Sequence, residues 1–173
     1  MQLYLAFMKP NTFAFVVAGT LSVLAGCASR PISLSSVGPE PIIHDGITSS
    51  GYLQVFSKTV MSEVGDDTYY YPHVSYNIYD KFGKRLKYVP NQIDNFDDSP
   101  TLMQMPPGNY NIVTLSESYG RVTVPVVIQA GRTTIVHLDK DWKPSSNISK
   151  NALVRLPNGE AVGWSSVSNA FSE

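Results

Sequence analysis

The two-residue alternation typical of a β-strand is clearest in residues 120–138, which read GRVTVPVVIQAGRTTIVHL. Pro125 interrupts this pattern and has no N–H to donate to a neighbouring strand, so we expect either that the strand lies at a sheet edge or that this position faces solvent. Ala130-Gly131-Arg132 then turns the chain, and residues 133–138 return as another strand. The apolar side chains that alternate along the first strand and face one side are Val122, Val124, Val126 and Ile128.

Short strands separated by turn residues extend this pattern over residues 51–140, and no window of ten residues there shows helical periodicity. The sequence therefore predicts an all-β fold, an antiparallel β-sandwich of about seven strands. The expected strands are 52–60, 69–79, 85–89, 101–105, 110–115, 122–129 and 133–138. A C-terminal hairpin is expected over residues 152–164, because Asn158-Gly159 is a strong turn signal.

Composition bounds the class of protein. The 173 residues are 43% hydrophobic and 16% charged, which excludes disorder of the highly charged kind for most of the chain. A net charge of −1 gives no basic footprint for nucleic acid. One cysteine cannot build a disulfide framework or a multi-cysteine zinc site.

That cysteine follows an apolar segment close to the N-terminus. Residues 13–24 carry no charge and are too short for a comfortable membrane span, as in the hydrophobic part of a secretory signal. The segment ends in Leu24-Ala25-Gly26-Cys27, which resembles the lipobox of bacterial lipoproteins at all four positions. The resemblance implies recognition of Leu24, Ala25 and Gly26 by the signal peptidase, cleavage before Cys27 and acylation of its thiol and amino group. Two or more acyl chains anchor a protein stably where one is marginal.

The domain organisation follows from this resemblance. We expect a signal peptide over residues 1–26, a lipidated and flexible tether over 27–50, the sandwich over 51–140, and a linker with the hairpin over 141–173. Translation is expected to begin at Met8, directly before Lys9, with Met1 as the alternative. The residue after the cysteine is Ala28 rather than Asp, which by resemblance to lipoprotein sorting favours the outer over the inner membrane. The alternative for Cys27 is an ordinary buried thiol.

A second resemblance concerns the sandwich. Residues 105–112, MPPGNYNI, precede Gly120, Ala130-Gly131 and a Thr- and Val-rich strand. This order is similar to the carboxypeptidase-regulatory-like, transthyretin-like and PEGA group of domains. The resemblance covers residues 51–140 and implies a prealbumin-like sandwich with a non-catalytic role.

Catalytic motifs are absent from the sequence, so no catalytic residue is assigned. His44, His73 and His137 are read as surface or hydrogen-bonded histidines, with pairing to an aspartate as the alternative. A loop with three aspartates could bind Ca²⁺, but a solvated acidic loop is favoured. These aspartates are Asp94, Asp97 and Asp98. No metal and no cofactor beyond the covalent lipid on Cys27 is expected.

Residues 69–73, YYYPH, contain the candidate contact residues Tyr69, Tyr70, Tyr71 and His73. Because neighbouring residues of a strand alternate, at least one tyrosine must face away from the core. Such a ring could stack on a sugar or contact a protein, or simply cover the end of the sandwich. The sequence thus favours a lipid-anchored envelope protein that binds an envelope protein or glycan. The alternative is an envelope hydrolase assembled from dispersed His and Asp residues.

Overall fold

The computed structural model of this chain describes residues 34–39, 49–63, 65, 68–92, 98–146 and 149–167. The chain divides into two units, Met1–Pro31 and Ile32–Glu173, and every described residue belongs to the second. Leu24, Ala25, Gly26 and Cys27 therefore lie outside the described residues. Within the described ranges, no helix is both long and apolar enough to cross a membrane.

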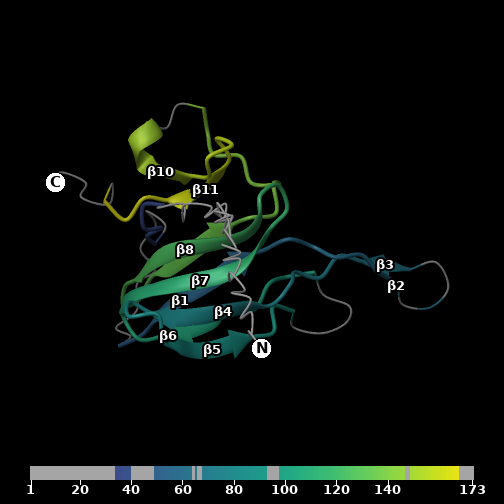
Figure 1. Cartoon of the computed structure of the whole chain (residues 1–173), viewed down its shortest axis with the longest axis horizontal. Coiled ribbons are helices and arrows are strands. Elements are labelled where there is room, and N and C mark those ends of the chain that lie inside the picture. The colour runs from purple at the N-terminus through teal and green to yellow at the C-terminus, as the bar shows by residue number, and fades with distance from the viewer. Residues whose placement is uncertain are drawn as a thin grey trace, which may run out of the picture. The chain divides into compact units, whose positions relative to one another are not determined.

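Two sheets form the sandwich (Figure 1). The four-stranded sheet has the order β5 (Arg85–Val89), β4 (Tyr76–Asp80), β7 (Gly108–Ser116) and β8 (Gly120–Ile128), all antiparallel. The three-stranded sheet has the order β6 (Met103–Met105), β1 (Gly51–Phe56) and β9 (Thr133–His137). The predicted all-β sandwich is confirmed. One pairing differs from the antiparallel expectation, since β1 and β9 run parallel.

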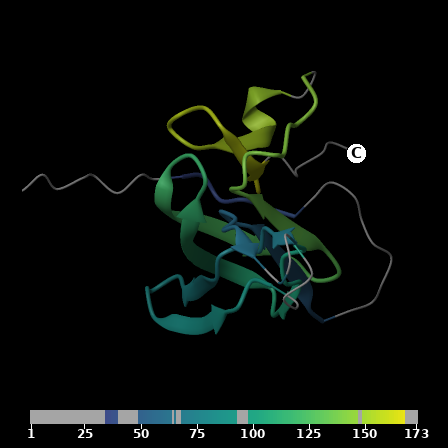
Figure 2. The same ribbon diagram turned by 90° about the vertical axis from the view of Figure 1, so that its right-hand side faces the viewer.

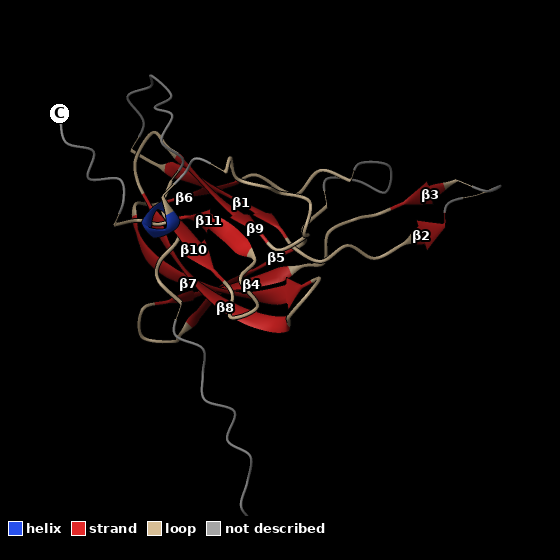
Figure 3. Cartoon of the chain, turned by 90° about the horizontal axis from the view of Figure 1, so that it is seen from above, coloured by secondary structure: helices blue, strands red, loops and turns tan. Residues whose placement is uncertain are grey.

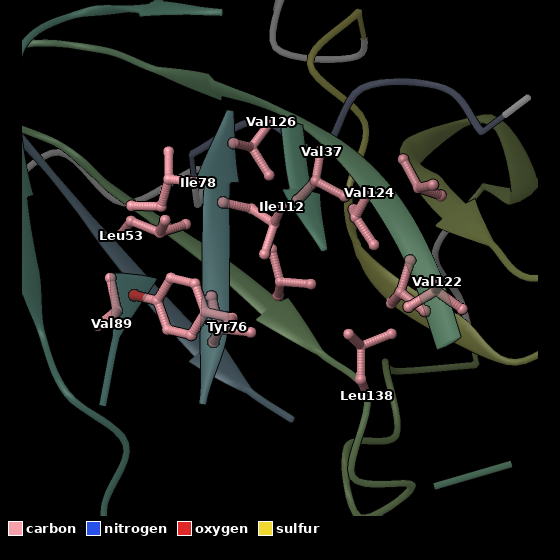
Figure 4. Packing of buried hydrophobic residues seen from close by; sticks show 14 of the residues in the cluster. Val37, Leu53, Tyr76, Ile78, Val89, Ile112, Val122, Val124, Val126 and Leu138 are labelled. Atoms are coloured by element: carbon pink, nitrogen blue, oxygen red, sulfur yellow. The ribbon is translucent and has the colours of Figure 1, made fainter. Parts of the chain in front are cut away.

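The core lies between these two sheets. Along β8 the predicted inward positions are buried, and they pack with side chains of β4 and β7 in the same sheet and of β1 and β9 in the facing sheet (Figure 4). Burying a valine or leucine side chain contributes roughly 1.5–3 kcal/mol, so this cluster is the main source of stability. It includes Leu53, Val55, Tyr76, Ile78, Ile112, Val122, Val124, Val126, Ile128, Val136 and Leu138.

Residues 34–39 extend the sandwich instead of forming part of the flexible tether expected for 27–50. Val37 is buried; its N–H donates to Pro125 O (2.9 Å) and its carbonyl accepts from Val127 N (2.8 Å). Pro125 thus turns its missing N–H toward the outer edge of β8, as expected, and Val37 covers that edge. Figure 2 shows this segment in dark blue between β8 and the C-terminal hairpin.

The predicted C-terminal hairpin is confirmed and belongs to the same core. A 3₁₀ turn, η1 (Lys150–Ala152), leads into β10 (Leu153–Arg155), which pairs with β11 (Ala161–Trp164). Gly159 in the connecting turn has φ +88°, a left-handed conformation that favours glycine. Three side chains of this region join the core cluster: Val154, Leu156 and Val162.

Candidate binding surface

Two short strands leave the sandwich as a projecting ribbon, seen at the right of Figures 1 and 3. They are β2 (Ser62–Glu63) and β3 (Tyr69–Tyr70), paired antiparallel. The ladder continues inward, since Val60 N–H donates to Pro72 O (3.1 Å) and Val74 N–H to Lys58 O (2.8 Å). We call residues 58–63 and 69–74 the arm. The expected strands 52–60 and 69–79 are each divided where the chain passes from a sheet into the arm.

A buried polar cluster holds the base of the arm. The Asn91 side chain is buried, and its Nδ2 donates to Val55 O (2.7 Å) and to Ser57 Oγ (3.0 Å). Ser57 Oγ in turn donates to Val74 O (2.6 Å), which joins the two strands of the arm. Because these hydrogen bonds tie the backbone of Val74 in the arm to the backbone of Val55 in β1, the cluster helps to set the direction in which the arm leaves the sandwich.

His73 belongs to the same base. Its Nδ1 lies 2.5 Å from Ser57 O, which is consistent with an Nδ1–H that donates to this carbonyl. The imidazole is buried and meets the Phe56 ring edge-on at 5.5 Å between centroids. His73, a predicted contact residue, therefore lies at the root of the arm and does not share the exposure of the tyrosines.

The outer arm exposes two of the three predicted tyrosines. Tyr69 and Tyr71 are 45% and 49% exposed, whereas Tyr70 is half-buried on the opposite face. Glu63 pairs with Tyr69, and the same register sets Met61, 61% exposed, opposite Tyr71. One face of the arm thus presents Met61, Glu63, Tyr69 and Tyr71; we call it the arm face. Met61 was not among the sequence candidates, although recognising the hairpin register would have found it.

Asp98 supports the arm from the neighbouring loop. Its Oδ1 accepts the backbone N–H of Tyr71 at 2.7 Å. The other two aspartates considered for Ca²⁺, Asp94 and Asp97, lie outside the described residues, as does His44. Within the described part of the chain, no group of three or more His, Cys, Asp or Glu side chains could hold a metal ion.

His137 lies in a column of aromatic rings beside the arm base. Its imidazole stacks on Phe56 on one side (5.0 Å, 18°) and on Trp142 on the other (4.3 Å, 8°). Trp164 of β11 meets Trp142 edge-on at 6.2 Å. Burial lowers the pKa of His137 to about 4, so the ring is neutral at pH 7. With both faces covered, His137 packs within the protein.

Asp139 is a carboxyl that interacts electrostatically with His73. Burial raises the pKa of Asp139, and hydrogen bonding to backbone N–H groups and the charge of His73 act in the opposite direction. Its Oδ1 is buried and has no hydrogen-bond partner in the described part of the chain. An apolar groove of about 250 Å³ lies elsewhere, between β5 and β6, and contains no histidine or aspartate. The dispersed His and Asp residues considered for a hydrolase therefore do not line that groove.

The arm face is thus the exposed surface on which the predicted contact residues Tyr69 and Tyr71 come together, supported by Asn91, Ser57 and His73 at its base. Comparison of the chain with protein-family models, with curated proteins and with solved structures found no match in any of the three.

Proposed function

We propose that this chain is a lipid-anchored cell-envelope protein that binds another envelope protein through the arm face. The anchor rests on the sequence Leu24-Ala25-Gly26-Cys27 at the end of an apolar segment. The binding role rests on one observation, the exposure of Met61, Tyr69 and Tyr71 on one face of a projecting ribbon.

The chemistry of the arm face favours a protein as the partner. Tyrosine and methionine are enriched in protein interfaces, where a tyrosine ring buries apolar area and keeps its hydroxyl hydrated. The methionine side chain is flexible and polarisable, so Met61 adapts to an irregular apolar surface. Small ligands prefer concave sites, whereas the arm projects. A glycan is therefore the second choice.

The base of the arm reduces the cost of binding. Asn91, Ser57 and His73 fix the root of both strands through hydrogen bonds to backbone carbonyls. Asp98 holds the second segment of the arm, residues 69–74, through the backbone N–H of Tyr71. A surface held in its binding geometry loses less conformational entropy when a partner docks, so more of the contact energy appears as affinity.

Metabolic labelling with palmitate tests the anchor. The intact chain should incorporate label and fractionate with membranes, and Cys27→Ser should abolish both. Ser146→Ala, at an exposed serine outside the lipobox, is the matched control and should label like the intact chain. Equal labelling of the Cys27→Ser chain would overturn the anchor.

Co-purification from membranes solubilised in mild detergent tests the binding role. The intact chain should retain a protein partner, and the double variant Tyr69→Ala/Tyr71→Ala should lose it. Tyr119→Ala is a matched control, because Tyr119 lies in the β7–β8 turn and is 38% exposed. Recovery of the same partner by the double variant would refute the role of the arm. If the chain bound isolated peptidoglycan and this binding required the two tyrosines, the partner would be a glycan and not a protein.

A further inference from the structure

The β4–β5 hairpin carries a concentrated positive charge. Four of the thirteen lysine and arginine residues of the chain fall within residues 81–87, and all four side chains are exposed. They are Lys81, Lys84, Arg85 and Lys87. The whole chain has a net charge of −1, so this local excess is opposite in sign to the rest of the protein.

The described part of the chain gives these cations no acidic side-chain partner. Among the described residues, no acidic side chain forms an ion pair with any of them; the ion pair that the structure shows joins Lys58 to Glu117. Lys87 Nζ lies 3.4 Å from Met103 Sδ, a weak acceptor without charge. Asp80 is the acid closest in sequence, and its Oδ1 accepts the backbone N–H groups of Phe82 (2.8 Å) and Lys84 (2.9 Å). The hairpin therefore presents four cations against one carboxylate that shapes its turn.

Apolar side chains are exposed between the cations. Phe82, in the turn, is 83% exposed, and Leu86 and Tyr88 on β5 are about half exposed. Lys81 Nζ lies 5.0 Å from the centre of the Phe82 ring. A projecting phenylalanine flanked by lysines combines an apolar group that water disfavours with charges that stay hydrated.

We propose that the β4–β5 hairpin binds the surface of an anionic phospholipid bilayer. Phe82 enters the boundary between headgroups and acyl chains, and Lys81, Lys84, Arg85 and Lys87 lie against lipid phosphates. This contact is additional to the lipid on Cys27 and does not require it. Basic residues beside an anionic membrane attract it electrostatically, and inserted aromatic area adds an apolar contribution.

The geometry favours a bilayer over an acidic protein strand. β5 is an edge strand, and lysine and arginine along an edge discourage the addition of a further strand. The pairing of β4 with β5 shifts register between Ile78 and Tyr79, a bulge that interrupts a regular edge. Phe82, the most exposed large apolar side chain among the described residues, lies in the β4–β5 turn, where it can enter a flat and deformable surface.

With an anchor at Cys27, the hairpin would give the protein a second membrane contact. Stable attachment commonly combines one lipid signal with a polybasic patch. Two contacts would also restrict the orientation of the sandwich relative to the bilayer.

Vesicle co-sedimentation tests the proposal on the full chain with Cys27→Ser, which removes the lipid. We expect at least tenfold tighter binding to vesicles of phosphatidylcholine with one-third phosphatidylglycerol than to phosphatidylcholine alone. The signal segment is common to all variants and carries no charge over residues 13–24, so the anionic preference reports on the remainder of the chain. Lys84→Glu/Arg85→Glu should remove that preference. The matched control Lys143→Glu/Lys150→Glu makes the same charge change at exposed sites and should retain it.

Insertion of the turn can be read directly, because the chain has one cysteine. In the Cys27→Ser background, Phe82→Cys gives a unique site for the environment-sensitive dye NBD. Its emission should shift to the blue and rise on adding anionic vesicles, whereas the dye at Tyr119→Cys should not respond. Equal anionic preference in Lys84→Glu/Arg85→Glu, or no dye response at position 82, would overturn the proposal. The proposal would also be overturned if the chain bound no vesicles and the hairpin instead captured an acidic protein. None of these variants alters Tyr69 or Tyr71, so this outcome is independent of the arm test.

Discussion

The imidazole of His137 stacks on the indole of Trp142 with ring centroids 4.3 Å apart and planes 8° apart. Phe56 covers the opposite face of the imidazole, and together the two rings exclude water from most of the His137 side chain. The pair links β9 to residues 139–146, which lead to the C-terminal hairpin. This contact makes the stability of the sandwich depend on pH.

We predict that the free energy of unfolding decreases as the pH falls from about 6.5 to about 4. Burial lowers the pKa of His137 from 6.5 to about 4. Between these two pH values the imidazole is therefore protonated in the unfolded chain and neutral in the folded chain. The stabilising contribution is complete above the unfolded pKa and is lost as the pH falls toward the folded one. The expected loss is about 1–3 kcal/mol, since the ring is partly exposed and solvent weakens the effect.

Urea unfolding at several pH values measures this loss, and His137→Phe should remove it while keeping the stack. Asp139 acts in the opposite direction, because its raised pKa gives stability at low pH that is lost as the pH rises. Subtracting the His137→Phe profile from that of the intact chain isolates His137. Parallel profiles would contradict the assignment.

We predict that Tyr76→Phe stabilises the protein by about 1 kcal/mol. The Tyr76 ring fills the core beside Val89, as Figure 4 shows, and its hydroxyl is buried with no hydrogen-bond partner among the described residues. Burial also raises the pKa of Tyr76, because the charged phenolate would lose its hydration in the core. Removing the hydroxyl leaves the packing of the ring intact and removes the cost of dehydrating it. A lower melting temperature for Tyr76→Phe would show that the hydroxyl has a partner.

We predict that Gly163→Ala destabilises the protein by about 1–3 kcal/mol. A Cβ at Gly163 would lie 2.6 Å from Val37 Cγ1 and 2.9 Å from Ile135 O. The close approach exists because residues 34–39 lie between β8 and β11. In a double-mutant cycle with Val37→Ala, the two effects should be less than additive, because the smaller side chain relieves one of the two clashes. Strict additivity would place Val37 away from β11.

The β8 pattern and the Asn158-Gly159 turn were predictable from sequence because both depend on local chemistry. Alternation assigns a face to each valine, and a left-handed glycine marks the turn. Residues 34–39 were not predictable, because proline, serine and glycine are also typical of a tether. What fixes Val37 is a pair of hydrogen bonds to β8, about ninety residues away in sequence.

The arm was predicted in part. Alternation within YYYPH required an exposed tyrosine, and the structure exposes Tyr69 and Tyr71. Its projection could not be predicted, because residues 52–60 read as one continuous strand. The chain leaves the sheet near Ser57, where Asn91 binds, and a polar residue in a loop gives no signal of such a role.

We predict that Asn91→Ala loosens the arm and costs about 1–3 kcal/mol of stability, because Ser57 and the backbone lose buried partners. Hydrogen exchange should locate the effect. The amides of Val60 and Val74, which join the two strands of the arm, should exchange faster, while the amides of β7 and β8 serve as the internal control. A uniform increase over the whole sandwich would mean that Asn91 supports the fold rather than the arm.

Site-specific photocrosslinking in intact cells tests the central claim most directly, that the arm face binds a protein of the envelope. Tyr71 is replaced by the photoreactive p-benzoylphenylalanine, with the same replacement at Tyr119 as the matched control. The account predicts a discrete crosslinked protein from position 71 that is absent at position 119. No crosslink from position 71, or the same products from both positions, would contradict it.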